Sequence, residues 1–196
     1  MARIDYYFSV LSPFTYLAGN RLEMLAERCG AEVVYKPMDI LKLFAETGGV
    51  PVPKRHWSRQ EYRLQELKRG SAAADLPLTL KPAHWPTDPV PASAAVMVAA
   101  DHGAEAGRLA QAFLRAIWAE EKDIAEPAVV AESLSLIGLD AKALGEDLGR
   151  AADRVAQNTA EALAAGVFGS PFYIVDGERF WGADRLPALE TRLGTL

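Results

Sequence analysis

A serine hydroxyl stands where a predicted strand gives way to a predicted helix. Residues 4–9 alternate between apolar and polar faces, as a half-buried strand does. Ser12-Pro13 interrupts the alternation, and the apolar residues of 15–29 then recur at helical spacing until Gly30. Unpaired N–H groups at the start of such a helix favour an anion such as a thiolate or a carboxylate. Ser12 is therefore either an ordinary N-cap or part of a site for such an anion.

Two further segments with polar side chains lie near the C-terminal end. Residues 166–172 read Gly-Val-Phe-Gly-Ser-Pro-Phe and place Ser170-Pro171 at the start of a predicted strand. Residues 180–186 read Phe-Trp-Gly-Ala-Asp-Arg-Leu and combine an indole, a carboxylate and a guanidinium. Both segments also have a purely structural interpretation, because Pro171 can be an ordinary trans proline and Asp184 can simply cap the last helix.

Together, the three segments resemble the DsbA-type thioredoxin fold, because they fall in the right order and at the two ends of the chain. In those oxidoreductases the first segment carries Cys-Pro-x-Cys, whereas this chain has Ser12 and Thr15 at the cysteine positions. The run Leu-Ser-Pro-Phe-Thr-Tyr resembles the kappa-class glutathione transferases and, most closely, the 2-hydroxychromene-2-carboxylate isomerases. The resemblance implies an α/β thioredoxin-like (DsbA-type) fold with an inserted all-helical subdomain, and it implies glutathione as the cofactor.

The resemblance also implies a role for each segment in glutathione binding. Ser12 would donate a hydrogen bond to the thiolate and would act as the catalytic residue. Ser170 would pair through its backbone with the cysteinyl residue, next to a cis Pro171. Trp181 would line the site, and Asp184 would face the γ-glutamyl ammonium.

Further candidates for glutathione binding lie beside these residues. Arg185 follows Asp184, and Ala183 occupies a place where the isomerases often carry Asn, so that it can offer only backbone groups. A basic cluster flanks the Gly/Pro loop at 48–53, and Lys54 is its proposed glutathione ligand. This cluster suits a carboxylate of glutathione or of an acidic substrate, or it is a solvated charged turn. Its members are Lys42, Lys54, Arg55 and His56.

The proline-rich segment 76–91 is predicted to be a loop that contributes to a substrate pocket. Within it, His84 and Trp85 are candidate pocket residues, and Phe44 is proposed for the same apolar wall. A packing loop with a hydrogen-bonded histidine is the alternative. The isomerases tend to carry Asn and Arg where this chain reads His-Trp-Pro-Thr-Asp over 84–88, a difference that bears on the particular substrate.

The activity implied by the resemblance is a glutathione-dependent isomerisation. A bound glutathione thiolate would add reversibly to an aromatic or unsaturated keto acid, and Ser12 would assist as a donor to sulfur. The alternatives are a kappa-like glutathione transferase or dehalogenase, and a non-catalytic thioredoxin-like binding module. A disulfide oxidoreductase is excluded, because Ser12 and Thr15 cannot form a disulfide.

Composition narrows the class of protein. The 196 residues are 50% hydrophobic, enough for a sizeable core, and the net charge of −5 argues against nucleic acid as a partner. No apolar run is long enough to span a membrane, and no signal-peptide pattern opens the chain. The single cysteine, Cys29, fits a buried thiol in a reducing cytoplasm, and the three histidines have no metal-ligand spacing. We expect a cytoplasmic homodimer that binds small molecules and no metal.

The expected domain organisation follows from two β-rich ends around a helical middle. Residues 1–39 plus 164–196 are predicted to form the thioredoxin-like domain, and 40–163 the helical insertion. After the first helix, the sequence predicts a strand at 32–37, a helix at 39–46 and a helix from a Ser58/Glu61 capping box to Gly70. Further helices are predicted at 92–102, around Leu109–Ile117, at 127–137, after a cap at Asp140, and at 150–165. A hairpin at 172–181 and a helix from Asp184 to Leu193 complete the predicted elements.

Overall fold

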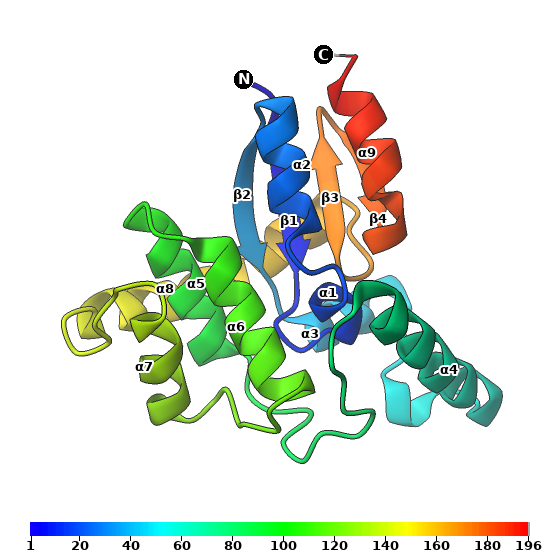
Figure 1. The fold of residues 1–196 in the computed structure, drawn as a ribbon, viewed down its shortest axis with the longest axis horizontal. Coiled ribbons are helices and arrows are strands. Elements are labelled where there is room, and N and C mark those ends of the chain that lie inside the picture. The colour runs from blue at the N-terminus through cyan, green and yellow to red at the C-terminus, as the bar shows by residue number, and fades with distance from the viewer. Residues whose placement is uncertain (196) are drawn as a thin grey trace.

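In a computed structural model that describes residues 1–195, four strands from the two ends of the chain form one mixed sheet (Figure 1). The strand order is β2-β1-β3-β4, with β1 and β2 parallel and the other neighbouring pairs antiparallel. The β1-α-β2 opening and the β3–β4 hairpin are as predicted, and so is their pairing into one sheet. The strands are β1 (Arg3–Phe8), β2 (Glu32–Pro37), β3 (Phe172–Val175) and β4 (Glu178–Trp181).

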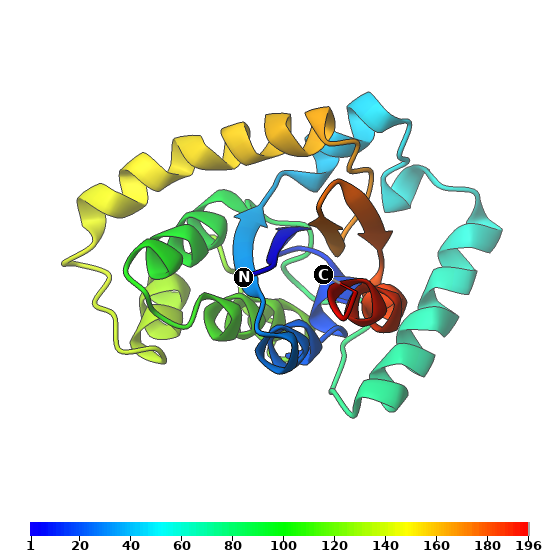
Figure 2. The ribbon, with the colours of Figure 1, turned by 90° about the horizontal axis from the view of Figure 1, so that it is seen from above.

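Helices make up the ordered elements between β2 and β3 in the described part of the chain. They are α3 (Ile40–Thr47), the 3-10 turn η1 (Val52–Lys54), α4 (Trp57–Ala74), α5 (Val90–Asp101), α6 (Ala106–Trp118), α7 (Pro127–Ser135) and α8 (Gly145–Ala164). Figure 2 shows α8 along one side of the sheet and α4 standing apart along another side. The division of the chain into two domains at residues 39 and 164 stays a prediction. No helix of residues 1–195 is both long and apolar enough to cross a membrane.

The alternation of the first strand separates two hydrophobic cores. Ile4, Tyr6 and Phe8 face the larger core, which they share with residues of α2, α5, α6 and α9. Tyr7 faces a smaller core on the opposite side of the sheet, against α3 and the end of α8. Burying one such apolar side chain contributes about 1.5–3 kcal/mol, so both faces hold the sheet in place.

The first helix is shorter than predicted. The chain forms α1 (Pro13–Tyr16), turns through 17–20, and continues as α2 (Arg21–Cys29), so the prediction of one helix over 15–29 is wrong. Gly19 has φ of 59°, a left-handed conformation that ends a helix, and its small size suits this turn.

Three helix starts also differ from prediction. His56, not Ser58, is the N-cap of α4, because Ser58 already lies inside the helix and its N–H donates to His56 Nδ1 at 3.4 Å. Asp140 accepts a bond from Lys142 N–H at 2.9 Å, but residues 141–144 form turns instead of a helix. Helix α8 begins at Gly145, five residues before the predicted start, because acidic residues in its first turn favour an N-terminus there.

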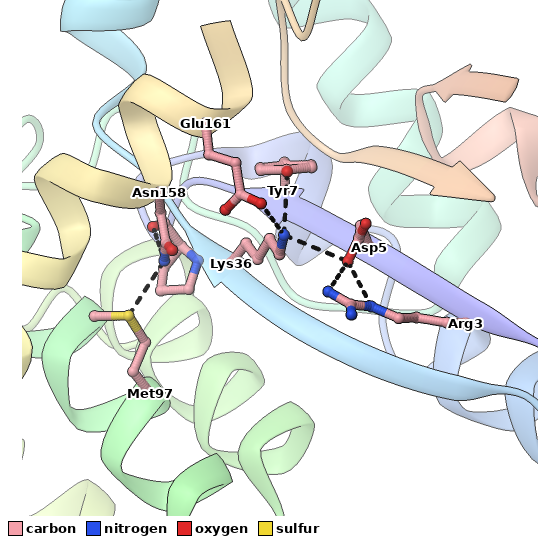
Figure 3. A network of polar contacts seen from close by, with 8 residues as sticks. Arg3, Asp5, Tyr7, Lys36, Met97, Asn158 and Glu161 are labelled. Atoms are coloured by element: carbon pink, nitrogen blue, oxygen red, sulfur yellow. Dashed lines mark hydrogen bonds and ion pairs between the residues drawn. The ribbon is translucent and has the colours of Figure 1, made fainter. Parts of the chain in front are cut away.

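A buried lysine attaches α8 to the sheet (Figure 3). Lys36 Nζ of β2 donates to Glu161 Oε1 at 2.6 Å and to Tyr7 Oη at 3.2 Å, and it lies 3.4 Å from Asp5 Oδ1. Burial lowers the pKa of Lys36, but the hydrogen bonds from its ammonium to Glu161 and Tyr7 outweigh burial, and the net pKa is raised. The charge of Lys36 is therefore fully compensated by this structural network.

Candidate active site

Two cavities meet beyond the end of β1 and before the start of β3. The Asp184 cavity has a volume of about 810 Å³ and the arginine cavity about 570 Å³. Phe14, Ser170 and Trp181 line both cavities and form their shared wall. A ligand in one cavity can therefore reach a ligand in the other near these three residues.

Ser12 lies on the wall of the arginine cavity and is also a helix cap. Its Oγ accepts a hydrogen bond from Thr15 N–H at 3.3 Å and donates to Ser170 O at 3.4 Å. The cap predicted for Ser12 is thus present, and the same hydroxyl borders the space in which a ligand would bind. A capping role does not remove it from the site.

The helix that begins at Ser12 is too short for the electrostatic effect predicted for it. Helix α1 has four residues, and a macrodipole grows with the number of aligned peptide units. Stabilisation of an anion at this point therefore falls on the Ser12 hydroxyl and on local N–H groups.

Ser170 connects the first and last segments of the chain. Its Oγ accepts from Ser9 N–H at 2.9 Å and lies 2.8 Å from Thr15 Oγ1. No acceptor for the Ser170 N–H occurs among residues 1–195, so this donor is available on the shared wall of the cavities. The Ser170-Pro171 bond is cis, as predicted.

Trp181 is part of the shared wall, and contacts with neighbouring residues restrict the position of its ring. Its ring packs edge-on against Phe168, with centroids 4.9 Å apart. A Cβ atom at position 169 would overlap Trp181 Nε1, so the close approach of the indole requires Gly169. The position of Trp181 at the junction of the cavities therefore depends on a glycine in the turn before β3.

Asp184 lines the Asp184 cavity together with Ala183 and Arg185. These three residues form the 3-10 turn η2 (Ala183–Arg185), and α9 (Leu186–Leu193) begins after it with Arg185 as its N-cap. The interpretation of Asp184 as the cap of the last helix is therefore wrong. Its carboxylate is exposed and lies 3.1 Å from the Arg185 guanidinium.

Aromatic side chains form the apolar wall of the arginine cavity. Phe44 and Trp85, both predicted at a substrate pocket, line it. Trp85 Nε1 donates to Leu11 O at 2.9 Å, which fixes the indole next to Ser12. The Trp85-Pro86 bond is a second cis bond, which was not predicted from the sequence.

Three arginines line the arginine cavity, and its lining contains no Asp or Glu. Arg55 was part of the predicted basic cluster, whereas Arg59 and Arg63 were missed. Arg63 is 8% exposed, and burial lowers its pKa to about 10, with a further contribution from the charge of Arg55. A sequence signal existed, because Arg63 lies four residues before the buried Leu67 on the same helix face.

The remaining predicted residues lie outside the walls of both cavities. Lys54 and Lys42 line neither, and His56 caps α4. The exposed His84 Nδ1 lies 3.9 Å from Asp123 Oδ2, and His84 does not line the cavity that Trp85 lines. The structure therefore brings Ser12, Ser170, Trp181 and Asp184 together, but not Lys54 or His84.

Comparison with known proteins agrees with this architecture. Residues 3–194 match the family model described as a DSBA-like thioredoxin domain. A 2-hydroxychromene-2-carboxylate isomerase of Sphingobium xenophagum is 32% identical over 97% of this chain and 97% of its own length. A solved structure of a 2-hydroxychromene-2-carboxylate isomerase superposes with a TM-score of 0.79 at 28% identity, covering 98% of this chain and 95% of that one.

A more distant similarity covers part of the chain. Glutathione S-transferase kappa 1 of Caenorhabditis elegans is 32% identical over 83 residues, which are 42% of this chain and 36% of that protein. The full-length matches decide the family. The chain is therefore an enzyme that belongs to the DSBA-like thioredoxin domain family and, within it, to the family of the 2-hydroxychromene-2-carboxylate isomerases.

Proposed function

We propose that this enzyme is a glutathione-dependent isomerase of the 2-hydroxychromene-2-carboxylate isomerase type. One observation carries the proposal: Ser12 borders a cavity with aromatic and cationic walls, and this cavity shares Ser170 and Trp181 with a second cavity that contains Asp184. Two compounds can therefore bind side by side, with their reacting atoms near Ser12.

Glutathione is the compound proposed for the Asp184 cavity. The exposed Asp184 carboxylate suits the γ-glutamyl ammonium, and the available N–H of Ser170 suits a carbonyl of the cysteinyl residue. Trp181 would cover the peptide between them. Arg55 lines the arginine cavity and its neighbour Lys54 lines neither cavity, so we assign the glycyl carboxylate to Arg55, with the glycyl end of glutathione extending past the shared wall into the arginine cavity.

Ser12 is the proposed catalytic residue. When bound, glutathione supplies a thiolate for reversible addition to an electrophilic carbon of an aromatic or unsaturated keto acid. Ser12 donates its O–H to the sulfur and so favours the thiolate over the thiol, whose unperturbed pKa is about 8.5. Its present bond to Ser170 O is long, at 3.4 Å, so the sulfur can replace this acceptor at low cost.

The substrate is proposed to occupy the arginine cavity. Phe44 and Trp85 supply an apolar wall for a flat ring or a conjugated chain, and the cavity volume of about 570 Å³ is in the range of small-molecule sites. The guanidinium groups on its wall suit an acid.

The direct test is to incubate the enzyme with 2-hydroxychromene-2-carboxylate and follow the acid by chromatography, with and without glutathione. We expect conversion to a product of the same mass that requires glutathione, while the glutathione concentration stays constant. Glutathione bound with heat in calorimetry but without conversion would contradict the isomerase assignment. No heat at all would favour a non-catalytic binding module.

A transferase is the second candidate, and the similarity to glutathione S-transferase kappa 1 supports it. The same cavities would serve it. Loss of glutathione into a conjugate with an electrophile such as 1-chloro-2,4-dinitrobenzene would identify a transferase, and net release of halide with oxidation of the thiol would identify a reductive dehalogenase.

A cytoplasmic location is proposed because the chemistry requires reduced glutathione, and Cys29 is a free thiol. A homodimer stays a prediction, and sedimentation of the purified protein tests it.

A further inference from the structure

Arg63 is a buried cation for which the protein provides no counter-charge. It lies on α4, 8% exposed, and lines the arginine cavity. Among residues 1–195 its guanidinium group makes no hydrogen bond and no ion pair, and it lies over aromatic rings. Leaving a buried charge without a partner is costly, so a retained one needs an explanation.

The groups around Arg63 make an anion the missing partner. Its guanidinium carbon lies 5.4 Å from the ring centroid of Trp85 and 5.8 Å from that of Trp118. These two rings restrict its orientation, but their faces do not carry a full negative charge. The other charged groups on the cavity wall are Arg55 and Arg59, which repel it. The local field therefore favours a negative charge in the cavity.

The shape of the cavity restricts the kind of anion. Trp85 and Phe44 line it beside Ser12, and aliphatic residues of α3 and of the loop before η1 complete its wall. An inorganic anion would leave this apolar surface exposed. A carboxylate attached to an aromatic or conjugated skeleton satisfies both the guanidinium and the apolar wall, and a planar guanidinium matches a carboxylate with two parallel hydrogen bonds.

We propose that Arg63 binds the carboxylate of the substrate and selects acids over neutral analogues of the same shape. This inference rests on the proposed function and adds a specificity-determining residue to it. The carboxylate is held beside Trp85, and because the Trp85 indole lies next to Ser12, the adjoining part of the molecule lies near the Ser12 hydroxyl. The glycyl carboxylate of glutathione is the competing source of the same charge, and the experiment separates the two.

The test compares an acid with its neutral counterpart. trans-2-Hydroxycinnamate and trans-2-hydroxycinnamamide are titrated into the wild type by calorimetry, with and without S-methylglutathione as an unreactive form of glutathione. We expect the acid to bind about 10- to 100-fold more tightly than the amide, the range typical of a charge-assisted bond. Equal affinities of acid and amide for the wild type overturn the proposal.

Variants then assign the preference to Arg63. Arg63→Met should bind the amide as the wild type does but lose most of the preference for the acid. Arg63→Lys should retain part of the preference, because it keeps the charge but not the planar pair of donors. Arg108→Met is the matched control, since Arg108 is an exposed arginine paired with Glu105 on α6. The control should behave as the wild type, and melting curves show that each variant is folded.

Two results overturn the assignment to the substrate. One is an unchanged preference for the acid in Arg63→Met. The other is a loss of S-methylglutathione affinity in Arg63→Met with the acid preference intact, which would place the glycyl carboxylate at Arg63. If the wild type binds no S-methylglutathione, the proposed function fails, but the acid preference measured without it still tests Arg63.

Discussion

Lys36 and Arg63 are both buried cations, with 7% and 8% of their surfaces exposed, but their surroundings are opposite. Lys36 contacts two carboxylates and a phenol, and its net pKa is raised. Arg63 contacts two aromatic rings and no acid among the described residues, and burial lowers its pKa to about 10.

The difference separates a structural charge from a functional one. The partners of Lys36 come from β1 and α8, so the network joins two elements of the fold. Arg63 forms no ion pair that joins two elements, and its guanidinium lies on the wall of a cavity. A buried cation whose partners are all internal serves packing, whereas one without them indicates a site for a ligand.

Removing the structural charge should have the largest effect on stability. Lys36→Met leaves Glu161 without its cation and Asp5 with Arg3 as its remaining cation, and it should lower the free energy of unfolding by about 2 kcal/mol, in the range for hydrogen bonds to charged groups. Urea unfolding measures it. Glutathione affinity should not change, because the network lies outside both cavities. A Lys36→Met variant as stable as the wild type would contradict the structural role of Lys36.

The pH dependence of stability gives a second test of the Lys36 network. Because the pKa of Lys36 is raised on folding, its contribution is complete below the ordinary lysine value of about 10.4 and is lost as the pH rises through the folded-state value. The stability difference between the wild type and Lys36→Met should therefore be constant from neutral pH to about pH 10 and shrink above it. A difference that already declines near neutral pH would contradict this.

Ser12→Ala tests the polar group that borders the same cavity as Arg63. The loss of a charge-assisted bond of about 1.5–3 kcal/mol should slow the glutathione-dependent reaction about 10- to 100-fold and raise the pKa of the bound thiol. The expected loss of stability from the missing cap is about 1 kcal/mol. The thiolate absorbance near 240 nm (roughly where thiolates absorb) should be followed across pH beside melting temperature.

An unchanged thiol titration with a lower melting temperature would make Ser12 a cap alone. Thr47→Ala is a suitable control, because Thr47 lines the cavity and its hydroxyl donates to Leu43 O, away from the sulfur position. It should leave the thiol titration unchanged.

Arg63→Met should have the smallest effect, and one of opposite sign to Lys36→Met. Replacing an unpaired buried charge with an apolar side chain of similar length should raise the free energy of unfolding by about 1 kcal/mol, reduced by the lost contacts with Trp85 and Trp118. Urea unfolding of this variant in parallel with Lys36→Met measures both signs in one experiment. Destabilisation equal to that of Lys36→Met would show that Arg63 is structural.

The fold was largely predictable because its signals are local. Alternation over residues 4–9 assigns each side chain of β1 to a core, since a strand has a period of two. The break at Gly19 was not predictable from periodicity, because apolar residues such as Leu17 and Leu22 continue the stripe on both sides of the turn.

The site residues that belong to recognisable sequence motifs were predictable. Those whose orientation depends on an irregular loop or on one face of a helix were not. Ser12, Ser170 and Asp184 stand in recognisable runs, and the structure brings these runs together. His84 and Trp85 are neighbours in an irregular loop, and no period indicates which of them faces the cavity. Arg63 was passed over because arginine at a buried helix position is unusual.

The sheet order has a consequence for the time at which this enzyme becomes competent during its synthesis. Ser12 is synthesised before β3, which pairs beside β1 and follows Ser170, and Asp184 comes after β4. At about 5–20 residues per second, about 10–35 seconds separate the synthesis of Ser12 from that of Asp184. Until β3 is synthesised the nascent chain holds one β1 edge without its partner, so this edge can be covered only shortly before the site is completed at Asp184.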